Sequence, residues 1–410
     1  MNFAIIGFGG RGKTYAHFIK YYEREIVAVC DSNRDRLNEA AKYGVIEKNL
    51  FIDENEFFSK GKIADALVIS TMDKLHYRQT IKALDLGYDI LLEKPISVDK
   101  QECMEIEKKA KAKGRKVCVC HVLRYAPIYK ALKDEADSGK YGEIVSVSMT
   151  ENIGYYHFAH SYVRGNWRNE EISAPLILAK NCHDLDLICW LIDKKCKSVS
   201  SYGSLKYFTE KNAPKGSDAF CVDCRYSKEC IYSAFNIYNN KEYEKAAGLA
   251  AHGNLGTTEK EITRALSDKT NLLSRCVFRC DNDICDNQIV NMLFDGDVTA
   301  QLKSIAFSET IDREFQVYMT KGMLRSVNGN IEYQILGGNK GVINVEKLIG
   351  GYAHHGGGDV MIVKEFIDYI ERGIKTKSIT DISLSVLSHK IGFAADLSQK
   401  SKGKLVEIDE

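Results

Sequence analysis

The chain has 410 residues and a net charge of +1, with 57 basic against 56 acidic side chains. A charge so close to zero gives no electrostatic reason to expect a nucleic acid or a membrane surface as partner. Hydrophobic residues make up 44%, enough for buried cores, and no apolar run reaches the roughly 18 residues of a membrane span. At roughly 100–200 residues per domain, the length predicts two domains and leaves room for a third.

The start of the chain, MNFAIIGFGG, does not resemble a secretory signal, because residues 3–6 already have the pattern of a buried strand. We therefore expect a cytoplasmic protein. Most of its 13 scattered cysteines are then expected to be buried thiols rather than disulfides.

A glycine-rich loop follows this first strand directly and precedes a predicted helix over residues 12–23. Its residues fit the pattern G-x-G-x-x-G and are Gly7, Phe8, Gly9, Gly10, Arg11 and Gly12. Gly7 permits the tight turn, Gly9 lets the backbone approach a pyrophosphate, and Gly12 lets helix and strand pack closely. The N–H groups at the helix start would face the phosphates.

A second predicted strand, residues 26–30, ends at Asp31, 19 residues after Gly12. An acidic residue at this distance binds the ribose hydroxyls of a dinucleotide, although an ordinary helix N-cap is the alternative. A carboxylate would repel a 2′-phosphate and so favours NAD over NADP. Arg34 and Arg36 follow closely and could soften that preference.

Strands and helices continue to alternate, with strands over 66–69, 89–92 and 116–119 and helices over 75–86 and 99–113. This alternation predicts a parallel, doubly wound sheet, and ligands of such sheets bind beyond the carboxyl ends of the strands. Ser70, Thr71, Glu93 and Lys94 at those ends are candidate cofactor-binding residues, and His121 lies at the end of the last strand.

The tripeptide Glu93-Lys94-Pro95 closes one of these strands, after the glycine loop, Asp31 and a His76 that opens a helix. These four markers, in this order and spacing, resemble the glucose–fructose oxidoreductase / inositol dehydrogenase family, also called Gfo/Idh/MocA. The resemblance runs through the whole first domain.

The resemblance implies an α/β fold: an N-terminal Rossmann domain over 1–122 and an α+β domain with a large open mixed or antiparallel sheet over 123–410. It implies a nicotinamide cofactor whose reactive face looks into the cleft between the domains. It places Lys94 beside the substrate hydroxyl as a catalytic group, with simple pairing to Glu93 as the alternative. Pro95 would hold Lys94 in place and is a candidate for a cis bond.

Further positions carry over from the family. His76 and Arg124 would lie near the cofactor, and Trp167 and Arg168 near the nicotinamide or a subunit interface. The exposed face of the second sheet is the family's usual interface, so a homodimer or homotetramer is expected.

A polar, aromatic stretch over residues 152–171 contains Tyr155, His157 and His160. Aromatic faces with hydrogen-bonding rims suit a sugar ring, whose C–H face stacks and whose hydroxyls need donors and acceptors. These three residues are therefore candidate substrate ligands. An ordered surface loop that packs its own aromatic side chains is the alternative.

A helix predicted over 178–192 places His183 and Asp186 on one face, with Lys180 one turn earlier. The family pattern has an Asp four residues before this His and another three after it. Asp186 fits the second, as a substrate ligand, but Ala179 replaces the first. We expect His183 to be an acid/base group or substrate ligand and Lys180 to be a substitute catalytic group; a structural histidine is the alternative.

Three functions remain open at this point. The leading one is an NAD(P)-dependent oxidoreductase that acts on a sugar, polyol or sugar derivative. Related enzymes in the family instead use NAD to cleave glycosidic bonds through a transient ketone, with the hydride returned at the end. A non-catalytic NAD(H)-binding sensor is the third.

Residues of about 209–288 interrupt the expected sheet with two cysteine groups, Cys221-x2-Cys224-x5-Cys230 and Cys276-x3-Cys280-x4-Cys285. A Cys-x2-Cys pair plus two distant thiols is typical of a metal site. We predict a structural zinc bound by Cys221, Cys224, Cys230 and Cys276, with Cys280 as the next choice for the fourth ligand. An iron–sulfur cluster is the runner-up, and a loop with free thiols the alternative.

The last third returns to strands, predicted as antiparallel neighbours over 288–295, 297–307 and 312–320. A glycine-containing loop over 352–359 then enters an amphipathic helix, for which Asp359 is the expected N-cap. His354, or its neighbour His355, is a candidate substrate ligand, and a flexible helix entry is the alternative.

Overall fold

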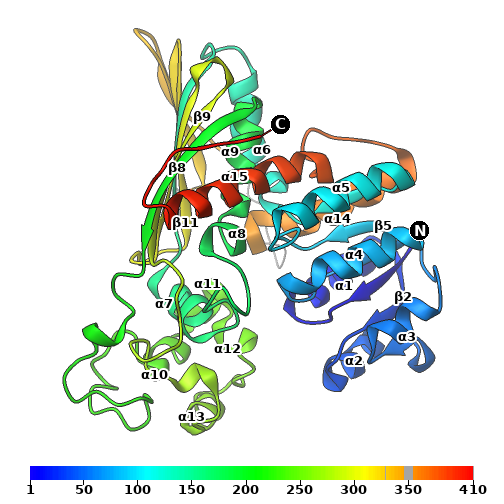
Figure 1. Ribbon diagram of the computed structural model, residues 1–410, viewed down its shortest axis with the longest axis vertical. Helices are drawn as coiled ribbons and strands as arrows, with labels where there is room; N and C mark the ends of the chain where they lie inside the picture. The colour runs from blue at the N-terminus through cyan, green and yellow to red at the C-terminus, as the bar shows by residue number, and fades with distance from the viewer. Residues whose placement is uncertain (328, 346–353, 410) are drawn as a thin grey trace.

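Two β-sheets, one in each half of the chain, organise the molecule (Figure 1). The computed structural model describes residues 1–327, 329–345 and 354–409. Within these ranges, no helix is both long and apolar enough to cross a membrane.

The first sheet has six parallel strands in the order β3-β2-β1-β4-β5-β6. They are β1 (Asn2–Ile6), β2 (Glu25–Cys30), β3 (Leu50–Phe51), β4 (Ala66–Ile69), β5 (Asp89–Leu92) and β6 (Val117–Val119). Strands buried on both faces need continuous apolar runs, and β4 (ALVI) is fully buried. The order is that of a Rossmann fold, which confirms the predicted fold class.

Helices cover both faces of this sheet. From the first half of the chain they are α1 (Gly10–Tyr21), α2 (Arg34–Ala40), α3 (Glu54–Ser59), α4 (His76–Asp85) and α5 (Lys100–Lys113). The end of the chain returns to the same domain with α14 (Gly358–Arg372) and α15 (Ile382–Lys400). Val360 and Phe366 join the core on one side of the sheet, and Ile382 and Val386 the core on the other.

The second sheet has nine strands in the order β14-β13-β12-β11-β7-β10-β9-β8-β15. They are β7 (Ile144–Asn152), β8 (Cys196–Ser204), β9 (Asn287–Phe294), β10 (Thr299–Ile305), β11 (Asp312–Met319), β12 (Gly322–Val327), β13 (Asn330–Ile335), β14 (Lys340–Ile343) and β15 (Val406–Glu407). Its β7–β10 pair is parallel and the other pairs are antiparallel, so the sheet is mixed, as expected.

One detail of this sheet differs from the expectation of three successive antiparallel neighbours. β9 and β10 do pair, but β7 lies between β10 and β11. A local sequence pattern identifies a strand but not the strands that pair with it. The sequence therefore shows no sign that β7, far earlier in the chain, pairs with both β10 and β11.

Helices pack on one face of the second sheet, among them α6 (Pro127–Asp137), α9 (Cys182–Ile192) and α15. Along β7 and β9 the buried side chains alternate with more exposed ones. The opposite face therefore leaves large apolar side chains in solvent, namely Tyr202, Ile289, Tyr318 and Val342.

The helix expected over 178–192 is broken in two. α8 (Leu176–Ala179) ends before Lys180, and α9 begins at Cys182. Between them the Asn181 side chain donates to Asp184 Oδ2 at 2.8 Å, and Lys180 turns toward the sheet. Asparagine competes locally with helical hydrogen bonding, which is consistent with the break.

An insertion separates β8 from β9 and carries short helices away from the sheet (Figure 1). These are α10 (Ala234–Tyr238), α11 (Lys241–Ala247), α12 (Leu249–His252) and α13 (Glu259–Ser267). It packs against α7 (Tyr155–Phe158) and the π-helical turn Ala159–Arg164 through an aromatic cluster that includes stacked Tyr156 and Tyr243 rings 4.0 Å apart.

Candidate active site

The glycine loop leaves an open cradle at the start of α1. No side chain caps this helix, whose N-cap is Gly9, so its first N–H groups are free of side-chain acceptors. A Cβ on Gly7 would lie 2.5 Å from the Ser70 carbonyl oxygen, and one on Gly12 only 2.1 Å from the Gly7 oxygen. A Cβ on Gly9 would meet nothing nearer than Arg36 at 3.7 Å. The loop is therefore tightly held at both ends and open in the middle, as a bound pyrophosphate requires.

Ser70 and Asp31 support this loop. Ser70 Oγ donates to the Gly7 carbonyl oxygen at 2.7 Å. Asp31 Oδ2 accepts the Phe8 N–H at 2.6 Å, which places the carboxylate directly beside the cradle. Asn33, not Asp31, caps α2. The alternative of Asp31 as an ordinary N-cap is therefore wrong, and its position suits the ribose of a dinucleotide.

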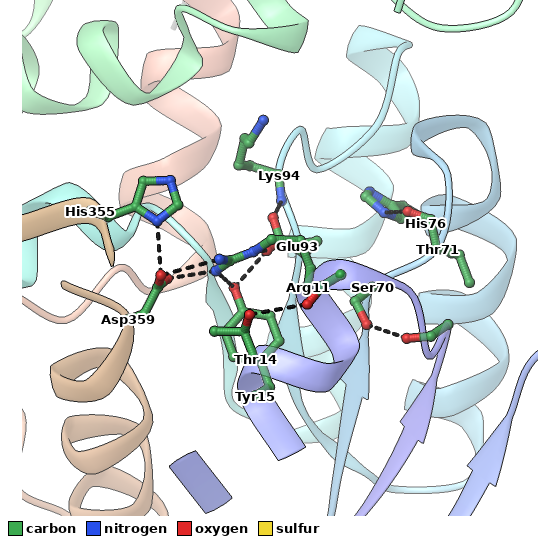
Figure 2. A network of polar contacts seen from close by, with 12 residues as sticks. Arg11, Thr14, Tyr15, Ser70, Thr71, His76, Glu93, Lys94, His355 and Asp359 are labelled. Carbon is green, nitrogen blue, oxygen red and sulfur yellow. Dashed lines mark hydrogen bonds and ion pairs between the residues drawn. The ribbon is translucent and has the colours of Figure 1, made fainter. Parts of the chain in front are cut away.

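Arg11 ties the glycine loop to two distant segments (Figure 2). Its Nε donates to Glu93 Oε1 at 2.6 Å and its Nη2 to Asp359 Oδ1 at 2.7 Å. Tyr15 donates to the same Glu93 oxygen at 2.6 Å, and His355 Nδ1 lies 2.8 Å from Asp359 Oδ2. Arg11 thus holds the loop in place, whereas its position in the motif suggested direct cofactor contact.

Opposite charges keep this network ionised. Burial opposes the charged forms, but Arg11 and Lys94 lower the pKa of Glu93, and Arg11 and His355 lower that of Asp359. In turn Asp359 raises the pKa of Arg11, again against burial. The prediction that Asp359 caps the N-terminus of α14 is wrong. Gly357 is the N-cap residue, and the Asp359 carboxylate pairs with Arg11 instead.

Lys94 follows β5, and its bond to Pro95 is cis. The half-buried Lys94 ammonium donates to the Ala179 carbonyl oxygen at 2.8 Å, while Glu93 accepts the Lys94 main-chain N–H at 3.0 Å. Pairing with Glu93 is thus not the role of the ammonium. Lys94 instead reaches across to the break between α8 and α9.

His76 holds this same loop from the other side. Its ring nitrogens lie 2.7 Å from the Pro95 carbonyl oxygen and 3.1 Å from that of Thr71 (Figure 2). The Thr71 hydroxyl donates to Gln79 at 2.6 Å. His76 and Thr71, both predicted to bind the cofactor, therefore make hydrogen bonds that hold the loops around the cradle in place.

His183 lies buried in α9, with its ring centre 5.7 Å from that of His121 and 6.4 Å from that of His355. Its Nδ1, like both ring nitrogens of His121, has no hydrogen-bond partner in the described part of the chain. Burial, then Lys94 and His121, lower the pKa of His183 well below its ordinary value. A neutral imidazole with a free nitrogen is able to accept a proton or bind a hydroxyl.

Two predicted ligand residues pair with each other instead. Buried Arg124 donates to both carboxylate oxygens of Asp186, at 2.6 and 2.7 Å. This bidentate pair fixes α9 against the turn Val122–Tyr125, so both residues position His183 rather than offer groups to a ligand.

Lys180 belongs to a buried charge cluster that the sequence did not predict. Its Nζ lies 3.1 Å from Glu151 Oε1, and Arg313 Nε lies 2.9 Å from Glu151 Oε2 and 2.6 Å from Asp184 Oδ1. Burial raises the pKa of Glu151 to about 7 and lowers that of Lys180. Glu151 was detectable in principle, since it shares the buried register of β7 with Val147 and Met149.

The aromatic stretch turns toward the insertion. His160 Nδ1 lies 2.9 Å from the Tyr238 hydroxyl, Arg168 donates to Asp281 at 2.8 Å, and Tyr155 pairs with Tyr243. His157 Nδ1 lies 3.3 Å from the Ile153 carbonyl oxygen. Half-buried Trp167 packs on the core of the second domain. Ligand roles for these five residues stay predictions, and the His354 side chain lies outside the described residues.

Of the predicted zinc site, the described part of the chain shows the four cysteines near one another but not a metal-binding arrangement. Cys221, Cys224, Cys230 and Cys276 line one small cavity, but no group of three or more His, Cys, Asp or Glu within the described ranges is arranged to hold a metal ion. All 13 cysteines are free thiols. The zinc site is therefore not assembled as predicted: the loop brings the four residues together without bringing their sulfurs to ligand spacing.

A Rossmann sheet with this glycine loop and an acidic residue after its second strand defines an NAD-binding oxidoreductase. Comparison with family models agrees. Residues 1–121 match an oxidoreductase family with an NAD-binding Rossmann fold, and residues 129–325 match a GFO/IDH/MocA C-terminal domain. The chain belongs to the Gfo/Idh/MocA family, and it is an enzyme of that NAD-dependent oxidoreductase class.

Among its relatives is YteT of Bacillus subtilis, whose name describes an oxidoreductase; it is 29% identical over 73% of this chain and 71% of its own length. An inositol 2-dehydrogenase/D-chiro-inositol 3-dehydrogenase of Halalkalibacterium halodurans is 26% identical over 49% of this chain and 55% of its own length. An Agrobacterium radiobacter oxidoreductase, solved with NAD+, L-tartaric acid and magnesium, has the same fold: TM-score 0.72, 14% identity, 100% of this chain and 98% of that one.

Proposed function

We propose that this oxidoreductase oxidises a secondary hydroxyl group of a sugar, polyol or sugar derivative and passes the hydride to NAD. One observation carries the proposal: Lys94, after β5, and buried His183, in α9, lie close together, because the Lys94 ammonium donates to the Ala179 carbonyl oxygen at the break before α9, at 2.8 Å. They do so beyond the carboxyl end of β5, where a Rossmann sheet presents its cofactor. Relatives named as inositol dehydrogenases support a polyol or sugar as substrate.

NAD, when bound, supplies the acceptor for the hydride. His183 would take the proton that the hydroxyl loses, since its imidazole is neutral and its Nδ1 has no partner within the described residues. The Lys94 ammonium, held by Ala179, would bind the same hydroxyl oxygen and stabilise negative charge on it. The Arg11 and His76 contacts would keep the loop that carries Lys94 in register with the cradle.

NAD rather than NADP is the proposed cofactor. The Asp31 carboxylate beside the cradle would bind ribose hydroxyls and repel a 2′-phosphate. Arg36 lies 3.6 Å from the same carboxylate and is partly neutralised by it.

The test is a panel of polyols, sugars and glycosides incubated with NAD, with NADH absorbance and free sugar both measured. We expect NADH formation with at least one polyol or sugar, and a loss of about 10²–10⁴-fold in Lys94→Met. Neither NADH nor sugar release from any member, with unchanged behaviour in Lys94→Met, would support a non-catalytic NAD(H) sensor and contradict the proposal.

Glycoside cleavage with recycled NAD is the second candidate, favoured by one observation. Ala179 replaces the carboxylate that the family's polyol dehydrogenases place before this histidine, and the adjacent Lys180 faces Glu151 instead. Release of free sugar without net NADH would select this function over simple dehydrogenation.

We further propose the division into domains over residues 1–122 and 123–410, with α14 and α15 of the second segment packed back onto the first sheet. We also propose self-association through the open face of the second sheet. Exposed Ile289 and Tyr318 on that face are apolar and lie on strands near its centre. Light scattering coupled to size exclusion should give a dimer or tetramer, and an Ile289→Lys, Tyr318→Lys double variant should shift it toward monomer.

A further inference from the structure

The small cavity in the insertion collects Cys221, Cys224, Cys230 and Cys276 from two segments about 50 residues apart. We propose that these four cysteines bind one structural zinc ion, through a modest closure of their side chains. The site is separate from the one that carries the proposed function and does not depend on it.

The backbone around these cysteines resembles that of a zinc knuckle, in which a tight turn carries two cysteine ligands. The Cys224 N–H donates to the Cys221 carbonyl at 3.3 Å, which makes Cys221–Cys224 a tight turn. Cys221 N–H donates to Ser274 at 3.0 Å and Cys276 N–H to Ala219 at 2.8 Å, on either side of an antiparallel bridge. Two thiols of a turn thus lie beside a third on the neighbouring segment. Tetrahedral zinc sites of the ribbon type are built in this way.

A buried arginine beside the cavity provides independent support. Arg164 is fully buried and lines the cavity, and its Nη1 has no hydrogen-bond partner in the described part of the chain. Its other guanidinium nitrogens donate to the carbonyls of Arg275 at 2.7 Å and Tyr232 at 2.6 Å, and Nη2 lies 3.8 Å from Cys221 Sγ. These partners are neutral while the cysteine is a thiol.

A buried cation without a counter-charge is costly. Zinc with four thiolates carries a net charge of −2, and Arg164 would offset one of these charges. The Ala234 N–H also points at Cys221 Sγ, at 3.4 Å, as main-chain donors do around metal-bound thiolates. The surroundings of the cavity therefore suit an anionic metal–thiolate centre better than four neutral thiols.

The size of the cavity favours a single ion. The centre of a water-sized atom can occupy about 20 Å³ of it, which is room for about one such atom between the thiols. The thiols are not at ligand spacing as they stand. A change of rotamer at one or more cysteines moves a sulfur without moving the backbone, so the segment need not refold to close on the ion.

The experiment uses full-length protein purified from zinc-supplemented cells, with zinc and iron measured by mass spectrometry. We expect about one zinc per chain in the natural sequence, and a loss of at least tenfold in Cys224→Ser and in Cys276→Ser. Cys285→Ser is the matched control, because this half-buried cysteine of the same insertion lies beside Gly203 rather than in the cavity. Cys280→Ser should also keep its zinc, since Cys280 does not line the cavity.

Less than about a tenth of an equivalent of zinc in the natural sequence would overturn the proposal, as would a full equivalent of iron in its place. Zinc retained by both cavity variants would overturn it too. If those variants fail to fold, protein expressed with cobalt decides: a sulfur-to-cobalt charge-transfer band is expected, and its absence from cobalt-loaded protein would contradict thiolate ligation.

Discussion

Replacement of Gly9 by alanine should change the affinity for the cofactor without lowering the stability of the fold. Gly9 has φ −74°, a value open to any residue, and its added Cβ would lie 3.7 Å from the nearest protein atom, Arg36 Nη1. Alanine at a compatible position stabilises a protein by about 0.4–1 kcal/mol through the unfolded chain. We therefore expect the free energy of unfolding to stay level or rise slightly.

The same methyl group would stand where the pyrophosphate approaches the backbone. Overpacking by one methyl group costs typically about 1–3 kcal/mol, which corresponds to NADH binding weaker by roughly 5- to 150-fold. Fluorescence titration with NADH and urea denaturation measure the two quantities. Gly12→Ala is the contrasting variant: its Cβ would lie 2.1 Å from the Gly7 oxygen, so both stability and affinity should fall. Unchanged NADH affinity in a stable Gly9→Ala protein would refute the position of the cradle.

Three further variants test the site. His183→Asn should lower kcat by about 10²–10⁴-fold with NADH affinity unchanged, because it removes the proton acceptor; His17→Asn, exposed on α1, is the control. Asp31→Ser should shift preference toward NADP by roughly tenfold, measured as the ratio of NADPH to NADH affinity. Glu151→Gln should abolish a pH dependence of stability: the folded pKa is raised from 4.5 to about 7, so the natural protein loses on the order of 3 kcal/mol as pH rises through that window.

Each has a contradicting outcome. Turnover of His183→Asn within threefold of the natural rate would remove His183 from the chemistry. An unaltered cofactor ratio in Asp31→Ser would show that Asp31 does not face the ribose. Parallel curves of unfolding free energy against pH for the natural protein and Glu151→Gln would mean that the pKa of Glu151 is not raised in the folded protein.

The first domain was predictable from sequence because its signals are local. A fully buried parallel strand such as Ala66–Ile69 is an unbroken apolar run, and the glycine loop follows β1 without a gap. The end of each strand then identifies the residues beside the ligand, which is how Lys94 was found. His183 came from family resemblance rather than from any local pattern.

Contacts between distant segments were not predictable. Arg11 and Asp359 are 348 residues apart, so neither the loop motif nor the helix start reveals that they pair. The same holds for Arg124 and Asp186, whose residue types alone fit a ligand site as well as an ion pair. The direction that Lys180 takes at the break between α8 and α9 depends on Glu151 of β7, a partner outside the local sequence.

The cysteine-rich insertion lies between these cases. Spacing alone selected Cys221, Cys224, Cys230 and Cys276, and these four do line one cavity. The polar stretch over residues 152–171 gives no sign that Arg164 is buried, since burial of a charge cannot be read from its neighbours in sequence.

The most direct test of the proposed chemistry follows the hydride itself. The polyol or sugar that the panel identifies would be deuterated at its carbinol carbons and incubated with NAD, and the reduced cofactor analysed by mass spectrometry. We predict one deuterium per reduced nicotinamide, formed at least about 100-fold more slowly by Lys94→Met. Reduced cofactor without deuterium, or transfer by Lys94→Met at the natural rate, would contradict direct hydride transfer at the Lys94–His183 site.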